Sequence, residues 1–462
     1  MTLQRTVSPV DDRILVERTL ADDAAIDAAL ERAAKAAPAW RDTPVERRAE
    51  IIGRAIDHMV ARREELAAEI TWQMGRPIAQ SPGEIRGLEE RARYMLAVAP
   101  RALADRQAEP RAGFTRFIRR EPLGLAFVIA PWNYPYLTAV NSIVPALAAG
   151  NTVLLKHSAQ TPLCAERFQE AFDAAGLPAG VFQHLHLSHD AALRIAGSGA
   201  AQLVAFTGSV PGGRAVQQAA GHAFITTNLE LGGKDPAYVR EDADLTHAVE
   251  NLVDGACFNS GQSCCGIERI YVHERRFDAF VAGYAELAAK YVLDDPTAST
   301  TSLGPMVRAS AADFARGQVR EAVAQGARAL IDPTAFAREA EGSAYMAPQC
   351  LVGVDHGMRM MHEESFAPIV GIMPVSGDEE AVALMNDSEF GLTASVWTRD
   401  EEAALRIGQR VATGTFFMNR CDYLDPALAW VGVKNSGRGC ALSEETYAHL
   451  TRPKSFHLRT AQ

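Results

Sequence analysis

Short apolar segments alternate with helical segments through most of this chain, and no other feature constrains its fold as strongly. Helical segments such as residues 163–175 and 191–196 separate strand-like segments at residues 126–130, 152–156, 181–187, 202–206 and 224–230. Strand–helix–strand connections of this kind are right-handed and build parallel sheets. The pattern therefore predicts a doubly wound α/β domain.

The same alternation returns in the second half of the chain, with strand-like segments at residues 269–272, 327–331, 369–375 and 393–397. Residues 22–97 have apolar positions three and four apart, which predicts two or three amphipathic helices. Residues 113–121 and 452–459 are interpreted as an exposed hairpin and a last strand. The predicted fold class is α/β, with two doubly wound, Rossmann-like parallel-sheet domains plus a β-hairpin and strand element.

Composition excludes several function classes. The chain has 462 residues, too many for one small binding module. Its net charge is −11, and no basic run is interleaved with aromatic residues, which argues against a nucleic-acid partner. No apolar stretch approaches the roughly 20 residues of a membrane span, and no secretory signal is found, so we expect no membrane partner and a cytoplasmic location.

The seven cysteines are an odd number and form no CxxC pair, and no histidine cluster has metal-ligand spacing. A disulfide framework and a metal site are therefore not expected. Any functional cysteine should be a free thiol.

Cys264 is the first of two consecutive cysteines in residues 258–266, Phe-Asn-Ser-Gly-Gln-Ser-Cys-Cys-Gly. Small polar neighbours allow a tight loop that presents a thiol and turns its own N–H toward a bound oxygen, as a covalent nucleophile requires. The alternative is that Cys264 is a small buried hydrophobic residue, as free cysteines often are. Only one of two consecutive side chains is expected to point into a given pocket, so Cys265 is expected to pack.

Glu230 ends a predicted strand and is followed by Leu-Gly-Gly. Parallel sheets bind ligands at the carboxyl ends of their strands. Partial desolvation there would raise the pKa of Glu230 and make it a base for water. The alternative is a surface glutamate at a strand end.

Two loops after predicted strands offer groups for binding. Pro131, Trp132 and Asn133 form a rigid turn with an amide donor for an oxyanion, and residues 206–213 open a helix whose N-terminus suits a phosphate. Each loop alone also fits ordinary turn chemistry. Lys156 ends a strand and Trp430 precedes a Val-Gly pair, and their simpler interpretations are a solvated lysine and a packing aromatic.

Taken in order, these segments resemble the aldehyde dehydrogenase superfamily, and the resemblance covers essentially the whole chain. The motifs Pro-Trp-Asn, Gly-Asn-Thr-Val with a lysine, Phe-Thr-Gly-Ser, Glu-Leu-Gly-Gly and Gly-Gln-x-Cys begin at Pro131, Gly150, Phe206, Glu230 and Gly261. Residues 364–368, Glu-Ser-Phe-Ala-Pro, are similar to the family's Glu-x-Phe-Gly-Pro, with Ala367 in place of glycine.

The resemblance implies NAD(P)-dependent oxidation of an aldehyde to the carboxylic acid. Cys264 would attack the aldehyde, Asn133 and the Cys264 N–H would hold the oxyanion, and Glu230 would activate water against the thioester. The implied cofactor-binding residues are Trp132, Lys156, Ser158, Gly208, Ser209, Gly213, Leu231, Glu364 and Phe366. The implied substrate-lining residues, a mostly aromatic set, are Tyr134, Phe258, Ser263, Cys265 and Trp430.

Two residues refine the expected ligands. Ala159 stands where NAD-preferring members often have a glutamate, so NADP is predicted to be accepted alone or beside NAD, with Lys156 supplying charge. Arg420 lies on a loop near the family's tunnel mouth, where it could bind the distal carboxylate of a semialdehyde such as succinic semialdehyde. The favoured alternative is a surface arginine paired with Asp422.

The resemblance also implies three parts. These are a dinucleotide-binding domain (residues 1–110 and 124–232), a catalytic domain (233–443) and an oligomerisation element (111–123 and 444–462). Unpaired edges of the hairpin and the terminal strand need a partner, so a homodimer or homotetramer is expected.

Three other functions remain as alternatives. A hydrolase without a redox cofactor would have no use for Lys156, Glu364 or the Phe-Thr-Gly-Ser turn. A binding protein that keeps the fold without turnover would have no use for Cys264, Glu230 and Asn133, although fold alone never proves activity. Acyl transfer to coenzyme A fits a water-activating glutamate less well than hydrolysis does.

Overall fold

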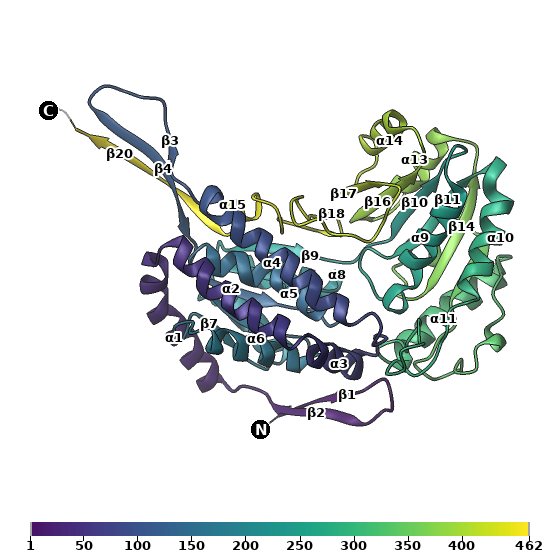
Figure 1. The fold of residues 1–462 in the computed structure, drawn as a ribbon, viewed down its shortest axis with the longest axis horizontal. Coiled ribbons are helices and arrows are strands. Elements are labelled where there is room, and N and C mark those ends of the chain that lie inside the picture. The colour runs from purple at the N-terminus through teal and green to yellow at the C-terminus, as the bar shows by residue number, and fades with distance from the viewer. Residues whose placement is uncertain (1, 461–462) are drawn as a thin grey trace.

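The computed structural model describes residues 2–460 and contains two α/β bodies side by side, with a long strand arm projecting from the first (Figure 1). The first body is built on a six-stranded sheet of order β19-β9-β8-β5-β6-β7. All its neighbouring pairs are parallel except β19 with β9. Its strands are β5 (Leu125–Ile129), β6 (Thr152–Lys156), β7 (Phe182–His184), β8 (Leu203–Thr207), β9 (Thr226–Glu230) and β19 (Gly437–Arg438).

Helices cover both faces of this sheet, because successive side chains of a strand point to opposite sides. Ala126 and Val128 of β5 belong to the core under α2, α4, α5 and α6, whereas Phe127 and Ile129 pack with α1, α7 and α8. The helices are α1 (Asp23–Asp42), α2 (Val45–Ala61), α3 (Arg63–Met74), α4 (Pro82–Ala102), α5 (Pro135–Ala148), α6 (Pro162–Ala174), α7 (His189–Gly197) and α8 (Val210–Ala220).

The second body is built on a seven-stranded sheet of order β12-β13-β14-β11-β10-β16-β17, in which only the edge strand β12 is antiparallel to its neighbour. The strands are β10 (Asp235–Val239), β11 (Ile267–His273), β12 (Arg328–Ala329), β13 (Gln349–Val352), β14 (Ile369–Val375), β16 (Thr393–Trp397) and β17 (Thr415–Met418). The helices of this part are α9 (Leu245–Cys257), α10 (Phe277–Ala288), α11 (Ala309–Ala324), α12 (Arg359–His362), α13 (Asp378–Asn386) and α14 (Glu401–Gly408).

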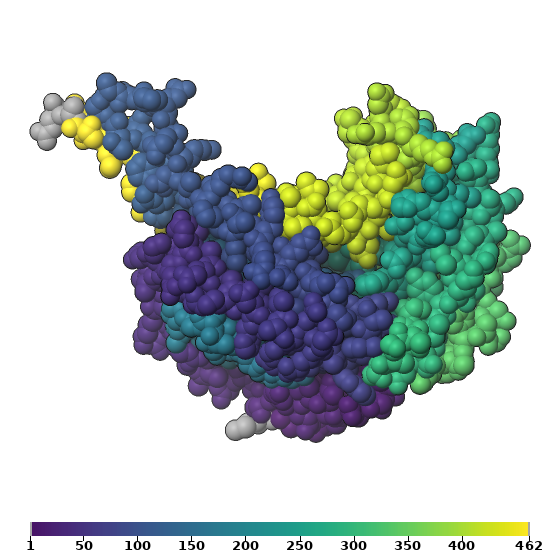
Figure 2. Space-filling model, viewed as in Figure 1, coloured from purple at the N-terminus to yellow at the C-terminus, as the bar shows by residue number. Residues whose placement is uncertain are grey.

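The arm is a three-stranded antiparallel sheet of order β20-β4-β3, made of β20 (Thr451–Arg459), β4 (Phe114–Pro122) and β3 (Arg106–Gln107). Stacked aromatic rings of Phe117 and Phe456, 4.6 Å apart, join the two long strands. The arm projects away from both bodies, as Figure 2 shows. Smaller elements complete the fold: β1 (Leu3–Val7), β2 (Ile14–Thr19), β15 (Phe390–Gly391), β18 (Val433–Lys434), η1 (Phe258–Gly261), η2 (Glu274–Arg276), η3 (Pro333–Ala335) and α15 (Thr446–His449).

The predicted fold class is confirmed, with corrections of detail. Four helices, not two or three, precede the first parallel strand, and a β1–β2 hairpin precedes them. The predicted strand at 181–187 shortens to β7, and that at 327–331 shortens to the edge strand β12. No helix within residues 2–460 has the length and apolarity needed to cross a membrane.

Candidate active site

Four neighbouring parallel strands of the first sheet end at one edge, and residues singled out in the sequence follow each of them. The carboxyl ends of parallel strands meet at the same edge, where open α/β sheets bind their ligands. The residues gathered there are Trp132 and Asn133 after β5, Lys156 at the end of β6, Gly208 and Ser209 after β8, and Glu230 and Leu231 at the end of β9.

Cys264 follows a tightly bent loop that begins with η1 at the end of α9. Asn259 and Ser260 have positive φ angles of 54° and 57°, which non-glycine residues seldom adopt. The Asn259 side chain donates hydrogen bonds to the carbonyl oxygens of Asn133, at 3.1 Å, and Gln262, at 3.2 Å. These bonds hold the strained backbone in place and so fix the position of the thiol.

Gly233 lets the Cys264 main chain approach β10 closely. A Cβ atom at position 233 would overlap the carbonyl oxygen of Cys264, so no other residue fits there without movement of the cysteine loop. The Cys264 N–H donates to no group within residues 2–460. The loop therefore presents both a partly exposed thiol and an unpaired N–H donor.

Asn133 is buried beside this loop. One hydrogen of its amide is donated to the carbonyl oxygen of Gln262, at 3.2 Å. The Asn133 carbonyl oxygen accepts from Arg76, whose guanidinium is paired with buried Glu84. Asn133 is not among the residues that line the cavity holding Cys264 and Glu230.

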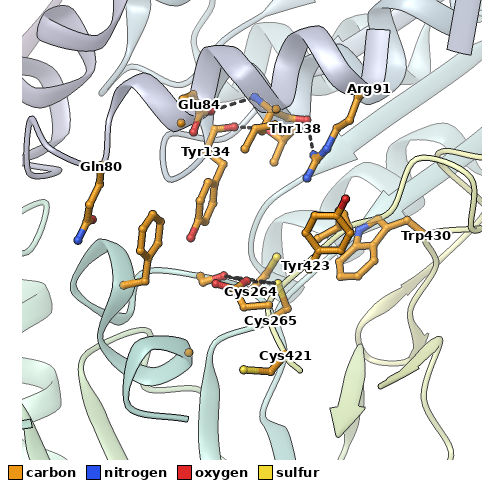
Figure 3. A pocket seen from close by; sticks show the side chains of 18 of the residues that line it. Gln80, Glu84, Arg91, Tyr134, Thr138, Cys264, Cys265, Cys421, Tyr423 and Trp430 are labelled. Atoms are coloured by element: carbon orange, nitrogen blue, oxygen red, sulfur yellow. Dashed lines mark hydrogen bonds between the residues drawn. The ribbon is translucent and has the colours of Figure 1, made fainter. Parts of the chain in front are cut away.

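Cys264 and Glu230 line the same cavity (Figure 3). Its volume is about 420 Å³, which suits a small ligand. In Figure 3 the cysteines lie on one side and Tyr134 on the other. The five residues predicted to contact substrate also line the cavity: Tyr134, Phe258, Ser263, Cys265 and Trp430.

Glu230 is the buried carboxyl group of this cavity. Its Oε2 accepts a hydrogen bond from Thr207 at 3.2 Å, whereas Oε1 has no partner within residues 2–460. Burial raises the pKa of Glu230 to about 7, against the opposing effects of the Thr207 hydrogen bond and the charge of Arg91. At neutral pH the group can therefore both accept and release a proton.

Both consecutive cysteines line the cavity. Cys265 is buried in the core, as expected, whereas Cys264 is partly exposed. Half-buried Asp422 accepts hydrogen bonds from the Cys265 thiol, at 2.8 Å, and the Ser263 hydroxyl, at 3.1 Å. Burial raises the pKa of Asp422 to about 6.

The expected pairing of Arg420 with Asp422 is also wrong. Asp422 turns inward to Ser263 and Cys265, and Arg420 is exposed, with its guanidinium 3.8 Å from the centre of the Tyr423 ring. Arg420 does not line the cavity, so it is not placed to bind a substrate carboxylate there either.

Glu364 lies on the loop that faces the Leu-Gly-Gly segment after β9. Its Oε1 accepts the N–H of Gly233 at 2.9 Å, and a Cβ atom at Gly232 would overlap the carboxylate. Burial raises the pKa of Glu364 to about 8, and the nearby charge of Glu268 adds to the rise. Next on the loop, Phe366 packs edge-to-face on Trp132, 5.7 Å between ring centres.

A buried ion pair holds the loop that carries Glu364 and Phe366. Lys234 pairs with Glu268 and donates to the Ser365 hydroxyl at 3.0 Å. The Glu268 carboxylate also accepts the backbone N–H groups of Ser365, at 2.8 Å, and Phe366, at 2.9 Å. These bonds hold Phe366 at a positive φ of 50°.

The start of α8, which follows β8 at the same edge of the sheet, suits a phosphorylated cofactor. Ser209 caps α8 by accepting the N–H of Gly212 at 3.3 Å, and the helix N-terminus attracts anions. Gly213 packs on Leu231 within this helix, where a Cβ atom would lie 2.6 Å from Leu231 Cδ2. The Gly208 N–H donates to the Glu230 carbonyl oxygen at 3.0 Å, which joins the helix start to β9.

The ammonium of buried Lys156 has no hydrogen-bond or ion-pair partner within residues 2–460, and burial lowers its pKa. A buried cation of this kind fits a cofactor hydroxyl or phosphate. Ser158 lies on the next loop, and exposed Ala159 brings no carboxylate. These donors and the α8 terminus fit a nicotinamide dinucleotide.

Sequence reasoning missed several charged groups of the cavity, among them Arg91 and the inward-facing Asp422. Arg91 lies in the middle of the regular helix α4 without a local motif, so no spacing marks it. The buried Arg76–Glu84 pair was missed as well. Glu84 accepts the N–H groups of Tyr136 and Leu137, both at 2.9 Å, and so fixes the start of α5.

The chain is similar to known proteins over nearly its whole length. The model of the aldehyde dehydrogenase family matches residues 2–456. An NAD(P)+ succinate semialdehyde dehydrogenase of Escherichia coli (strain K12) is 36% identical over 430 residues, covering 92% of this chain and 90% of the relative. An NADP+ succinate-semialdehyde dehydrogenase of Deinococcus radiodurans is 33% identical over 449 residues, 97% of this chain and 93% of the relative.

A solved structure of succinic semialdehyde dehydrogenase from Streptococcus pyogenes with NADP+ superimposes with a TM-score of 0.94 at 26% identity. The match covers 99% of this chain and 100% of that one. The resemblance stated from the motifs is confirmed over the whole length, and the chain belongs to the aldehyde dehydrogenase family.

Proposed function

We propose that this chain oxidises an aldehyde to the carboxylic acid with NAD(P)+, with Cys264 as nucleophile and Glu230 as base. The observation that carries the proposal is the shared cavity of a partly exposed thiol and a buried carboxyl group whose pKa is raised to about 7. Covalent catalysis requires a nucleophile beside a base whose pKa lies near the working pH.

In the proposed mechanism, Cys264 reacts as the thiolate, its proton having passed to solvent, and the sulfur adds to the aldehyde carbon. The oxyanion of the hemithioacetal accepts hydrogen bonds from the Cys264 N–H and the Asn133 amide. When bound, NAD(P)+ supplies the acceptor for the hydride that leaves this carbon, and Cys264 is left as a thioester. Glu230 then removes a proton from water, which attacks the thioester; the C–S bond breaks, the acid is released, and the proton on Glu230 passes to the Cys264 sulfur.

The cofactor would be held by the residues at the strand edge. Lys156 and Ser158 would bind the adenosine part, Gly208, Ser209 and the start of α8 the pyrophosphate, and Glu364 the ribose beside the nicotinamide. The walls of the cofactor site would be formed by Trp132, Phe366, Gly213 and Leu231. Ala159 brings no carboxylate to repel a 2′-phosphate, which supports use of NADP+ as well as NAD+.

A semialdehyde is the second candidate substrate. The Escherichia coli, Deinococcus radiodurans and Streptococcus pyogenes proteins carry that name, and this cavity holds buried charged groups beside the mostly aromatic wall that was expected.

The first test measures NAD(P)H formation with an aldehyde panel for the wild type and for Cys264→Ala, with Cys350→Ala, in β13 of the second body, as the control. We expect Cys264→Ala to lose about a thousandfold or more of kcat/KM, and the control to remain within about threefold. A cofactor-free hydrolase would cleave esters without dinucleotide-dependent aldehyde oxidation, and a binding protein would bind dinucleotide without turnover.

We also propose a homodimer or homotetramer formed through the arm. The outer edge of β20 has no neighbouring strand within residues 2–460, and Leu458 on it is exposed, so this edge suits pairing with another copy. The proposed partition is residues 1–110 with 124–232, residues 233–443, and residues 111–123 with 444–462, of which 1, 461 and 462 lie outside the described residues. The long strands of the two sheets and of the arm support it, whereas β19 pairs in the first sheet and β3 in the arm, across the proposed boundaries. All seven cysteines are free thiols, which supports a cytoplasmic location.

A further inference from the structure

We propose that Arg91 binds the distal carboxylate of the substrate, which makes an aldehyde with a terminal carboxylate the preferred substrate class. This inference rests on the proposed function and deepens it. Arg91 lies on α4, in the wall of the cavity that holds Cys264 and Glu230. Figure 3 shows its side chain reaching from that helix into the space between Thr138 and Tyr423.

The guanidinium of Arg91 is buried, and the charges of Glu84, Glu230 and Glu90 act on it without forming an ion pair. The residue is 8% exposed, and it forms no ion pair within residues 2–460. Its Nη1 donates to the carbonyl oxygen of Leu137, at 2.8 Å, and to Asn141 Oδ1, at 3.3 Å. Nε and Nη2 donate to no group in that part of the chain, so a buried cation keeps one edge free, which is costly unless a ligand occupies it.

The free edge has the shape that a carboxylate requires. Nε–H and Nη2–H of a guanidinium are parallel and bind both oxygens of a carboxylate at once. Arg119 of this chain already binds Asp105 in this way, with Nε and Nη2 at 2.9 and 2.7 Å from the two oxygens. We expect Arg91 to hold a substrate carboxylate with the same pair of donors.

The other charged groups of the cavity leave Arg91 as the best-placed cation. Arg76 is already paired with Glu84, and Arg86 is exposed to solvent, which weakens its attraction. Asp422 is bound by Ser263 and Cys265. Glu230, with a pKa of about 7, is partly neutral at physiological pH and does not fully balance the arginine charge.

The experiment compares succinic semialdehyde with butanal, which has the same four-carbon chain without the carboxylate. The readout is the ratio of kcat/KM for the two aldehydes in the wild type, Arg91→Met, Arg91→Lys and the control Arg93→Met. Arg93 lies on the same helix but pairs outward with Asp57 and Glu89. We expect Arg91→Met to lower the ratio about 10- to 100-fold, mainly through a higher KM for succinic semialdehyde.

Arg91→Lys should keep part of the ratio, because it keeps the charge without the paired donors, and Arg93→Met should leave it within about threefold. An unchanged ratio in Arg91→Met, or an equal loss for both aldehydes, overturns the assignment. The same holds if Arg86→Met lowers the ratio instead. Failure of the proposed function is a separate result, in which the wild type forms NAD(P)H with neither aldehyde.

Discussion

Glu230 and Arg91 line the same cavity and act on each other through their charges. Burial raises the pKa of Glu230 to about 7, and the positive charge of Arg91 limits that rise. Burial also lowers the pKa of Arg91, and the charge of Glu230 is among the influences that oppose this. One buried arginine would thus orient the substrate and also keep the base ionisable near neutral pH.

This coupling predicts the pH dependence of turnover. Glu230 acts as a base only when deprotonated, so where thioester hydrolysis limits the rate, kcat should fall about tenfold per pH unit below its pKa and level off above it. The pH–rate profile, measured from about pH 5 to about pH 9, should bend near pH 7. Glu230→Gln should lack the bend, and Arg91→Met should move it to higher pH. A bend near the ordinary carboxyl value, or one that survives in Glu230→Gln, contradicts the assignment.

Gly233 contacts the Cys264 main chain closely, so adding one methyl group at position 233 should lower both stability and kcat/KM. Gly233→Ala must push the Cys264 carbonyl away, and such overpacking costs about 1 to 3 kcal/mol. Displacement of the nucleophile should lower kcat/KM by roughly 100-fold. Thermal melting and kinetics check this, with Gly53→Ala in α2 as a control, since a Cβ atom there meets nothing within 4 Å. Wild-type kinetics in Gly233→Ala would show that the contact does not position the thiol.

The absence of a carboxylate at Ala159 predicts that NADP+ is accepted as well as NAD+. Ala159→Glu introduces a carboxylate that repels a 2′-phosphate, so the ratio of kcat/KM for NADP+ over NAD+ should fall at least about tenfold. Ala159→Gln has the same length without the charge and should change the ratio much less. The prediction is wrong if the wild type already favours NAD+ by more than about a hundredfold, or if the two variants behave alike.

Much of this fold could be predicted because parallel strands buried on both faces leave a local sequence signal. Residues 152–156, 369–375 and 393–397 were predicted with the bounds that β6, β14 and β16 have. The β1–β2 hairpin was missed, since its strands are short and mostly exposed, so their apolar residues do not form a buried run.

The site could be predicted only where chemistry leaves a local motif. Cys264 and Glu230 stand in distinctive segments at a loop and a strand end. Arg91 is one of several arginines on α4, and helical spacing alone does not tell which of them meets the cavity. Asp422 was expected to pair with its neighbour Arg420, but its positive φ of 49° accompanies a side chain that turns inward to the cysteine loop.

The most direct test of the central claim is the time course of NAD(P)H formation when Glu230→Gln is mixed rapidly with aldehyde and cofactor. If Cys264 forms the thioester and Glu230 activates the water that cleaves it, each active site should release about one NAD(P)H in a burst. Steady turnover should then be about 100-fold or more below that of the wild type. Steady turnover at the wild-type rate in Glu230→Gln would contradict the account.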